Sequence, residues 1–201
     1  LTLTGNHIYE DEDLDAAAAR VLFDLTGLQD IYLEQFRTFG APHRISKEND
    51  RAWLRANGRN PDQRIITVGY YSLLATDNVT LEWKGRNVQW MPVDEVKSLA
   101  FDHLEILEEA LAALRRKLLH EPIGFALLPE KFTLSQLQRI YEVILGVSLD
   151  KRNFRKKIAR MKYLVPLDEK QKGVAHKPAR LYVFDREQYE ANKKDLLDFA
   201  I

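Results

Sequence analysis

The sequence at residues 133–161 reads TLSQLQRIYEVILGVSLDKRNFRKKIARM and decides the fold of the second half of the chain. Thr133 followed by Gln136 three residues later is a capping-box pattern, which begins a helix. Gly146 is typical of the residue that ends one. Apolar residues recur between them at the helical period: Leu134, Leu137, Tyr141 and Ile144. We therefore predict a helix that begins after Thr133 and ends at Gly146.

A second helix is predicted over residues 151–161, because Asp150 is a suitable N-cap four residues after Gly146. Three apolar residues fall at i, i+4 and i+7 and are expected to be buried together: Phe154, Ile158 and Met161. The outer faces are left to polar and basic residues: Arg152, Asn153, Arg155, Lys156 and Arg160. Two helices joined by a short turn, the second of them basic, are typical of a helix-turn-helix.

The residues after this pair of helices predict a wing. Residues 163–167 and 179–184 favour strands, and the segment between them is basic and contains Gly173. Lysines in such a loop neutralise phosphates while the second helix enters the major groove. We therefore predict a winged helix that binds DNA. The alternative is a small helical domain whose lysines and arginines only keep it in solution.

The predicted DNA contacts come from both helices and the wing. Arg152, Asn153 and Lys156 are the expected base or phosphate contacts, since Asn bonds adenine and Arg bonds guanine in a bidentate manner. Lys157 and Arg160 are expected to face phosphate or solvent. For Thr133, at a helix start that can hold a phosphate, a simple capping role is the alternative. The full predicted set is Thr133, Ser135, Gln136, Arg152, Asn153, Arg155, Lys156, Lys157, Arg160, His176, Lys177 and Arg180.

The charge of the chain is unevenly distributed although its formal net charge is zero. Residues 1–120 hold 14 basic and 19 acidic residues, whereas residues 131–180 hold 13 basic and 4 acidic, a net charge of +9. Such asymmetry favours a polyanionic partner for the second half, the alternative being a solvated basic surface. The chain has no Cys and no apolar run long enough to span a membrane, so a disulfide framework and an integral membrane protein are excluded. Zero Cys fits a reducing compartment, and we expect a cytoplasmic protein.

The first half of the chain is predicted to mix helices and strands. We expect a helix over residues 13–25 that ends at Gly27 and a helix with a leucine stripe over residues 102–119. Strands are expected at 1–4, 31–39, 65–75 and 88–91, a polar loop at 42–62, a linker at 123–130, and a short helix or tail at 185–201. Residues 1–4 suggest a strand already under way, so we expect native sequence before Leu1. The predicted domains are residues 1–120 and 121–201.

The sequence around the first helix resembles a degenerate Nudix signature. Residues 1–28 read LTLTGNHIYEDEDLDAAAARVLFDLTGL, and alignment on Gly27 matches Arg20 to the arginine of the motif and Glu12 to its upstream acid. Asn6 stands at the leading glycine. At two helix positions the Nudix motif has carboxylates that hold divalent metal. This chain has Val21 and Leu25 at those positions. Only Asp24 keeps a carboxylate there, so we expect no metal site and no ordinary turnover; the alternative is weak binding of a metal by Asp24 with the remote Glu12.

Together the two halves resemble the Nudix-related transcriptional regulators of bacteria. The motifs that carry the resemblance are FDH at 101–103, FTLSQLQ at 132–138, LDKRNFRKK at 149–157 and KPARLYVF at 177–184. The resemblance implies an α+β fold, namely a Nudix-like α/β/α sandwich whose first strands precede Leu1, followed by a winged helix-turn-helix. It implies a homodimer on a palindromic operator and an effector bound in the Nudix domain. That effector is ADP-ribose in one branch and a pentose such as arabinose in another.

The predicted effector-binding residues are Asn6, His7, Glu12, Arg20, Asp24, Arg44 and Arg64. Arginines in the insertion at 45–63 favour a phosphorylated ligand, or else form a basic surface near DNA. No cofactor is expected, and no His, Asp or Glu spacing predicts zinc. Two rival functions remain at this point: an active hydrolase of nucleoside diphosphate derivatives, and a protein-interaction adaptor whose winged helix has lost DNA binding.

Overall fold

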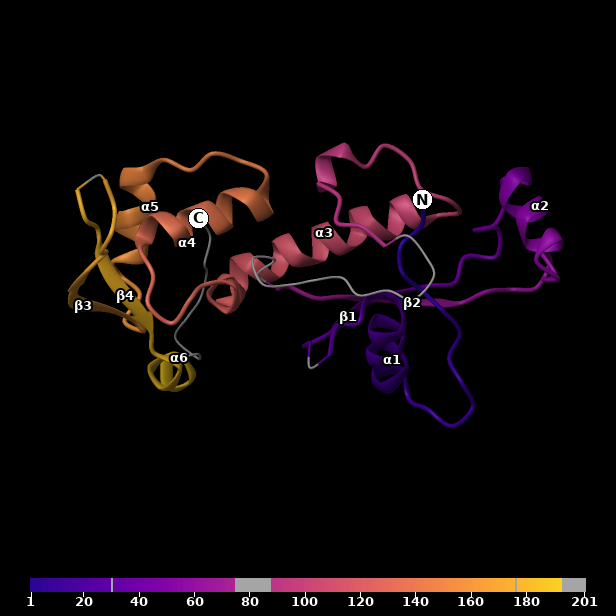
Figure 1. Cartoon of the computed structure of the whole chain (residues 1–201), viewed down its shortest axis with the longest axis horizontal. Helices are drawn as coiled ribbons and strands as arrows, with labels where there is room; N and C mark the ends of the chain where they lie inside the picture. Colours follow the sequence, from indigo (N-terminus) through magenta and orange to yellow (C-terminus); the bar gives the residue numbers. More distant parts are fainter. Residues whose placement is uncertain (30, 75–87, 176, 193–201) are drawn as a thin grey trace. The chain divides into compact units, whose positions relative to one another are not determined.

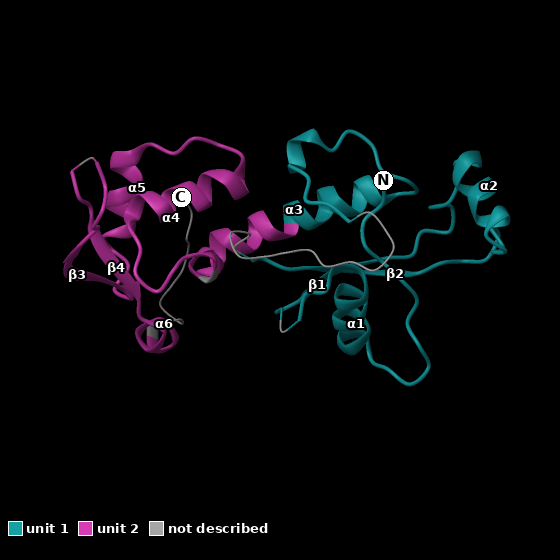
Figure 2. Ribbon diagram, in the orientation of Figure 1, with its two compact units in different colours: residues 1–112 teal, residues 113–201 magenta. Residues whose placement is uncertain are grey.

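The computed structural model describes residues 1–29, 31–74, 88–175 and 177–192 (Figure 1). The chain divides into two compact units, Leu1–Ala112 and Ala113–Ile201 (Figure 2). The division falls inside helix α3, His103–His120, so the last part of that helix belongs to the second unit. No helix among the described ranges is long and apolar enough to cross a membrane.

In the part of the first unit that the structure describes, α-helices accompany a small antiparallel sheet. Its elements are α1 (Leu14–Thr26), β1 (Glu34–Phe39), α2 (Glu48–Ala56), β2 (Thr67–Tyr71), the 3-10 helix η2 (Val93–Glu95) and the first part of α3. Strands β1 and β2 pair from Glu34 with Tyr71 to Phe39 with Thr67. At their centre Gly69 lies against the Phe36 ring, where a Cβ atom would stand 2.6 Å from two ring carbons.

The predicted helix at 13–25 is confirmed as α1, and its ends follow from the sequence. The Asp13 carboxylate accepts a hydrogen bond from the Ala16 amide at 2.8 Å. Gly27 adopts a left-handed conformation with φ 74°, and its N–H donates to the Phe23 carbonyl at 2.8 Å. Asp13 and Gly27 thus satisfy backbone groups that the helix leaves open at its ends.

The predicted loop at 42–62 is wrong, because it contains α2. Only Leu54 of this helix is buried, so the segment shows little of the apolar periodicity on which a helix prediction depends. Ion pairs help to hold it: Arg51 binds Asp62 beyond the helix, and Arg55 binds Glu48 at 2.7 Å. A polar sequence with tertiary partners therefore folds where local signals indicate a loop.

Two of the strands predicted in the first half are also wrong. Residues 88–91 form no strand, and among the described residues β1 and β2 pair only with each other. Residues 1–4 form none either, because their backbone is bonded elsewhere. The Leu1 carbonyl accepts from the Ala100 amide at 2.9 Å, and the Leu3 amide donates to His103 Nδ1 at 3.0 Å.

The second unit has the element order that the sequence predicts for a winged helix. After the end of α3 come η3 (Ile123–Leu127), α4 (Leu134–Leu145), α5 (Lys151–Ile158), β3 (Leu164–Lys170), β4 (Arg180–Phe184) and α6 (Arg186–Asn192). β3 and β4 are antiparallel, and Phe132 extends the pair through backbone bonds with Tyr182 on β4. α5 ends one turn earlier than predicted, and β3 continues into the predicted wing loop as far as Lys170.

The core of the second unit is largely aromatic, and it corrects the predicted linker at 123–130. That segment is folded as η3, and its Phe125 ring stacks on Phe184 at 4.6 Å between centroids. Tyr163 meets both rings edge-on. Gly124 is closely packed at this turn, since a Cβ atom would lie 3.2 Å from the Tyr141 ring and 3.4 Å from Leu118. The supposed linker is therefore part of the core.

Candidate nucleic-acid interface and effector site

Helix α5 buries two side chains and exposes the rest. Phe154 is 2% exposed and Ile158 is 1% exposed, and Phe154 meets the Tyr141 ring of α4 edge-on. The Asp150 carboxylate caps the helix by accepting from the Asn153 amide at 2.8 Å. The exposed residues include every DNA contact predicted on or just after this helix: Arg152, Asn153, Arg155, Lys156, Lys157 and Arg160. A basic surface of this kind suits a polyanion.

The turn between α4 and α5 is fixed by hydrogen bonds that the sequence did not reveal. Glu142 accepts from the Leu149 amide at 2.9 Å, and Gln138 donates to the Leu149 carbonyl at 2.9 Å. Gln138 also donates to Glu142 at 3.0 Å. These two donors lower the pKa of the Glu142 carboxyl. Gly146, with φ 70°, ends α4 as predicted and opens the turn.

The start of α4 has the predicted capping box. The Gln136 amide donates to the Thr133 hydroxyl at 3.2 Å, and the Gln136 side chain accepts from the Thr133 amide at 2.8 Å. Thr133 is 2% exposed, so its side chain serves as a cap, whereas Ser135 and Gln136 are exposed. Of the residues predicted on this helix, Ser135 and Gln136 are thus the two that lie at the surface.

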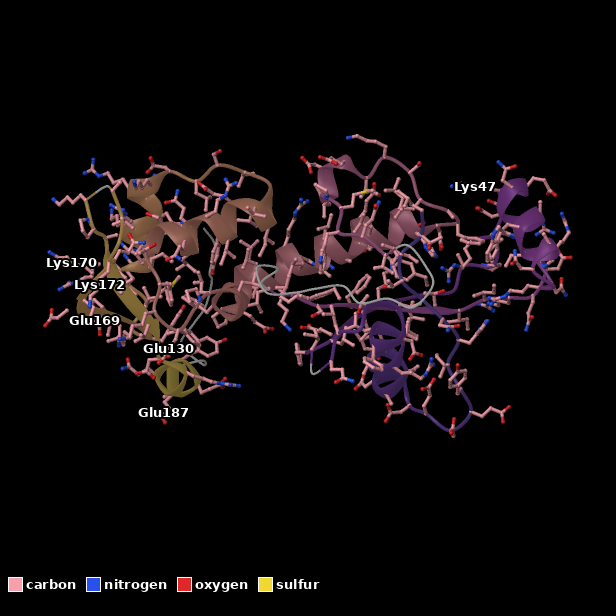
Figure 3. The ribbon with its side chains drawn as sticks, viewed as in Figure 1. Lys47, Glu130, Glu169, Lys170, Lys172 and Glu187 are labelled. Atoms are coloured by element: carbon pink, nitrogen blue, oxygen red, sulfur yellow. The ribbon has the colours of Figure 1, made fainter. Side chains whose placement is uncertain are left out.

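The wing presents cations together with acids. Lys131 Nζ lies 2.8 and 2.9 Å from the two carboxylate oxygens of Glu169 on β3, which raises the pKa of Lys131. Arg180 lies 3.4 Å from Asp168, and Lys177 is exposed. His176 lies outside the described residues. Figure 3 shows Glu169 with Lys170 and Lys172 at the outer edge of the hairpin.

In the first unit, five of the predicted effector residues lie on α1 or in the segment before it. Arg20 donates to both carboxylate oxygens of Glu12, to the His7 carbonyl at 2.8 Å and to Asp24 at 3.5 Å. Its guanidinium carbon lies 3.9 Å from the centre of the Tyr9 ring. Asn6 accepts from the His7 amide at 2.9 Å. Arg20 therefore organises this loop from the centre.

The residues at the degenerate Nudix helix do not fit a divalent metal. Glu12 bonds Arg20 and accepts from the Tyr9 amide at 2.8 Å, and its hydrogen bonds with Arg20 lower the pKa of its carboxyl to about 2. Val21 and Leu25 offer no oxygen ligand. No group of three His, Asp or Glu able to hold a metal occurs in the part of the chain that the structure describes. The Glu12 carboxylate is therefore engaged by the Arg20 guanidinium.

The other two predicted effector residues, Arg44 and Arg64, line a cavity of about 450 Å³ between residues 41 and 65. Arg44 binds Asp102 through two hydrogen bonds of 2.7 and 2.8 Å and donates to the Phe39 carbonyl at 2.8 Å. Arg64 is exposed and donates to the Gly40 carbonyl at 3.0 Å. The cavity is within the size range of small-molecule sites.

Comparison with known proteins points to one family. Residues 124–184 match the NrtR DNA-binding winged helix domain. The chain is 30% identical over 193 residues to the ADPR responsive transcriptional repressor NtrR of Acinetobacter baylyi, covering 94% of this chain and 71% of that protein. The chain belongs to the NrtR family of transcriptional regulators.

Solved structures agree with this membership. Shewanella oneidensis NrtR complexed with a 27mer DNA is 28% identical with a TM-score of 0.64, over 94% of this chain and 81% of that chain. A second solved structure, of NrtR from the same organism, is 29% identical with a TM-score of 0.62, over 91% of this chain and 79% of that chain. A MutT/nudix family protein of Enterococcus faecalis, 20% identical with a TM-score of 0.57 over 88% and 70%, shares the fold. The predicted α+β class, a Nudix-like unit followed by a winged helix, is confirmed.

Proposed function

We propose that this NrtR-family chain binds operator DNA through α5 and the wing, and that a metabolite bound in the first unit controls this binding. The observation that carries the proposal is the exposed basic surface of α5 within a winged helix. Base contacts are assigned to Arg152, Asn153 and Lys156, because these side chains match the donor and acceptor patterns of the major groove. The remaining predicted cations position the protein on phosphates.

The proposed effector is ADP-ribose or a close relative. The Acinetobacter baylyi relative is named as responsive to ADPR, which favours a phosphorylated effector over the pentose alternative. Arg64, exposed at the cavity, is the preferred contact for a phosphate. Arg44 shapes the cavity by holding the Phe39 carbonyl. Arg20 orders the loop before α1 by holding the His7 carbonyl.

Catalytic inactivity of the first unit is part of the proposal. Pyrophosphate hydrolysis of the Nudix type needs a metal held by carboxylates. Here Glu12 is bonded to Arg20, and Val21 and Leu25 replace the helix carboxylates. A first unit without these metal-binding carboxylates is expected to bind its metabolite without hydrolysing it.

The active assembly is proposed to be a homodimer on a palindromic site in the bacterial cytoplasm. Two-fold symmetry of a dimer places two copies of α5 on successive major grooves of a two-fold symmetric operator. Sedimentation of the protein with and without duplex tests this: one chain per half-site supports the dimer, and a single chain per operator contradicts it.

Selection from a random duplex library tests the regulator directly. We expect enrichment of a two-fold symmetric sequence, and release or strengthening of the bound duplex on addition of ADP-ribose but not of arabinose. If duplex binding changes with arabinose and not with ADP-ribose, the effector is a pentose and not ADP-ribose. No enrichment, together with no salt-dependent binding to any duplex, would favour the adaptor function, since phosphate contacts give log–log salt slopes of roughly −0.9 per neutralised charge.

A further inference from the structure

One side chain of α3 contacts the helix-turn-helix from outside it. Arg115 Nε donates to the Ile144 carbonyl at 2.9 Å. Ile144 lies in the last turn of α4, whose final carbonyls have no partner inside the helix. A cation is favoured at that end because the helix dipole is negative there. Arg115 therefore acts as a C-terminal cap supplied by a different helix.

The same guanidinium covers the residue that opens the turn toward α5. An Arg115 terminal nitrogen lies 3.5 Å from where a Cβ atom of Gly146 would stand. Gly146 is in the left-handed conformation, with φ 70°, and its N–H donates to the Glu142 carbonyl at 2.9 Å. Arg115 thus bonds the end of α4 and lies beside the first residue of the turn.

The backbone of this turn sets the direction in which α5 leaves α4. Gln138 and Glu142 hold the turn at Leu149 from the α4 side. Arg115 holds its other end, near Gly146. Leu118, one turn further along α3, is fully buried and anchors this part of the helix in the second unit.

We propose that Arg115 is a positioning residue for DNA recognition, which fixes the α4–α5 turn and makes the affinity for operator DNA depend on the end of α3. Base contacts need α5 within a fraction of an ångström of its place, whereas phosphate contacts by long cations tolerate displacement. Loss of Arg115 therefore weakens specific binding more than non-specific binding.

The position of α3 along the chain extends this role to regulation. The chain passes from the first unit into the second within α3. Residues 113–120 therefore begin the second unit, directly after the unit that is proposed to bind the effector. This extension rests on the proposed effector function. If ADP-ribose changes the DNA affinity of a variant without Arg115 as much as it changes that of the wild type, Arg115 has no part in regulation. Its positioning role would be unaffected by that result.

The test compares Arg115→Ala with Arg116→Ala, its exposed neighbour on the same helix. Each variant of the full chain is measured for affinity to the duplex recovered by selection and to a random-sequence duplex. We expect Arg115→Ala to lose about three- to tenfold on the selected duplex and clearly less on the random one. Arg116→Ala is expected to stay within about twofold of the wild type on both. Binding of ADP-ribose is expected to be unchanged in both variants.

Two further measurements separate positioning from other roles. Hydrogen exchange of the amides at 147–149 is expected to be faster in Arg115→Ala than in Arg116→Ala, and Arg115→Lys, which keeps a donor, is expected to restore part of the affinity. An equal loss on both duplexes, with a log–log salt slope reduced by roughly 0.9, would make Arg115 a phosphate contact and overturn the proposal. Unchanged DNA affinity with only a lower melting temperature would overturn it as well. If Arg115→Ala does not fold, Arg115→Lys alone carries the comparison of the two duplexes.

Discussion

Helices α1 and α5 begin in the same way but use their charges differently. Each is capped by an aspartate, Asp13 or Asp150, whose carboxylate accepts from a backbone amide at 2.8 Å. Around α1 the cation Arg20 is enclosed by Glu12 and by the loop before the helix. On α5 the basic side chains lie exposed along the outer face. The charge of Arg20 thus holds its own loop, whereas the basic side chains of α5 face outward.

The largest expected effect concerns the buried face of α5. Phe154→Ala removes a ring that is 2% exposed and packs on Tyr141, so the free energy of unfolding is expected to fall by about 3–5 kcal/mol. Arg155→Ala, on the exposed face of the same helix, is the matched control and is expected to change it by less than about 0.5 kcal/mol. Urea unfolding followed by circular dichroism measures both. Equal effects would show that α5 does not pack as described.

The next effect concerns the exposed face. Arg152→Ala is expected to weaken binding to the selected duplex by about 1–3 kcal/mol if this side chain contacts a base. Arg20→Ala removes a cation from the first unit and is expected to leave the affinity of the protein for DNA unchanged in the absence of effector. Fluorescence anisotropy at fixed salt gives both values. An unchanged affinity for Arg152→Ala would take this residue off the interface.

The third effect is the pH dependence of the stability that the Glu12–Arg20 pair contributes to the folded protein. The pKa of Glu12 is lowered to about 2 in the folded protein from an ordinary value near 4.5, chiefly by its hydrogen bonds with Arg20. A lowered folded pKa means that the stabilising contribution is fully present above about pH 4.5 and is lost as the pH falls toward 2.

Glu12→Gln should therefore be less stable than the wild type at pH 6, with the gap closing below about pH 4.5. Urea unfolding at a series of pH values measures this gap, and Glu10→Gln, at an exposed position nearby, is the control. A gap that stays constant from pH 6 to 2.5 would show that the carboxyl is not held by Arg20.

The sequence predicts those elements whose start, end or buried face is marked by residues within the element itself. Helices α1, α4 and α5 were predictable because a cap and a left-handed glycine or an apolar stripe lie within each segment. The Arg44–Asp102 pair was not, since its partners are 58 residues apart. The Arg115–Ile144 bond and the stacking of Phe125 on Phe184 likewise depend on tertiary packing that no local pattern encodes.

The smallest expected effect is at the wing, where acids accompany the cations. Glu169→Gln releases Lys131 from its carboxylate partner and removes one negative charge beside the hairpin. Because exposed ion pairs contribute little, stability is expected to change by less than about 1 kcal/mol. Affinity for a random duplex is expected to rise about twofold, with a slightly steeper salt dependence. Gln171→Glu, which adds a negative charge beside the same wing, should move the affinity in the opposite direction, and a rise there would contradict this role.

The most direct test of a metabolite-sensing unit joined to a DNA-binding unit follows both activities in one sample. The protein is bound to its selected duplex, ADP-ribose and Mg²⁺ are added, and anisotropy and phosphorus NMR are recorded together. We predict that the anisotropy changes while ADP-ribose stays intact. Conversion of ADP-ribose to two phosphate monoesters at a rate that Asp24→Asn abolishes, with no change in anisotropy, would contradict the account and make the chain a hydrolase.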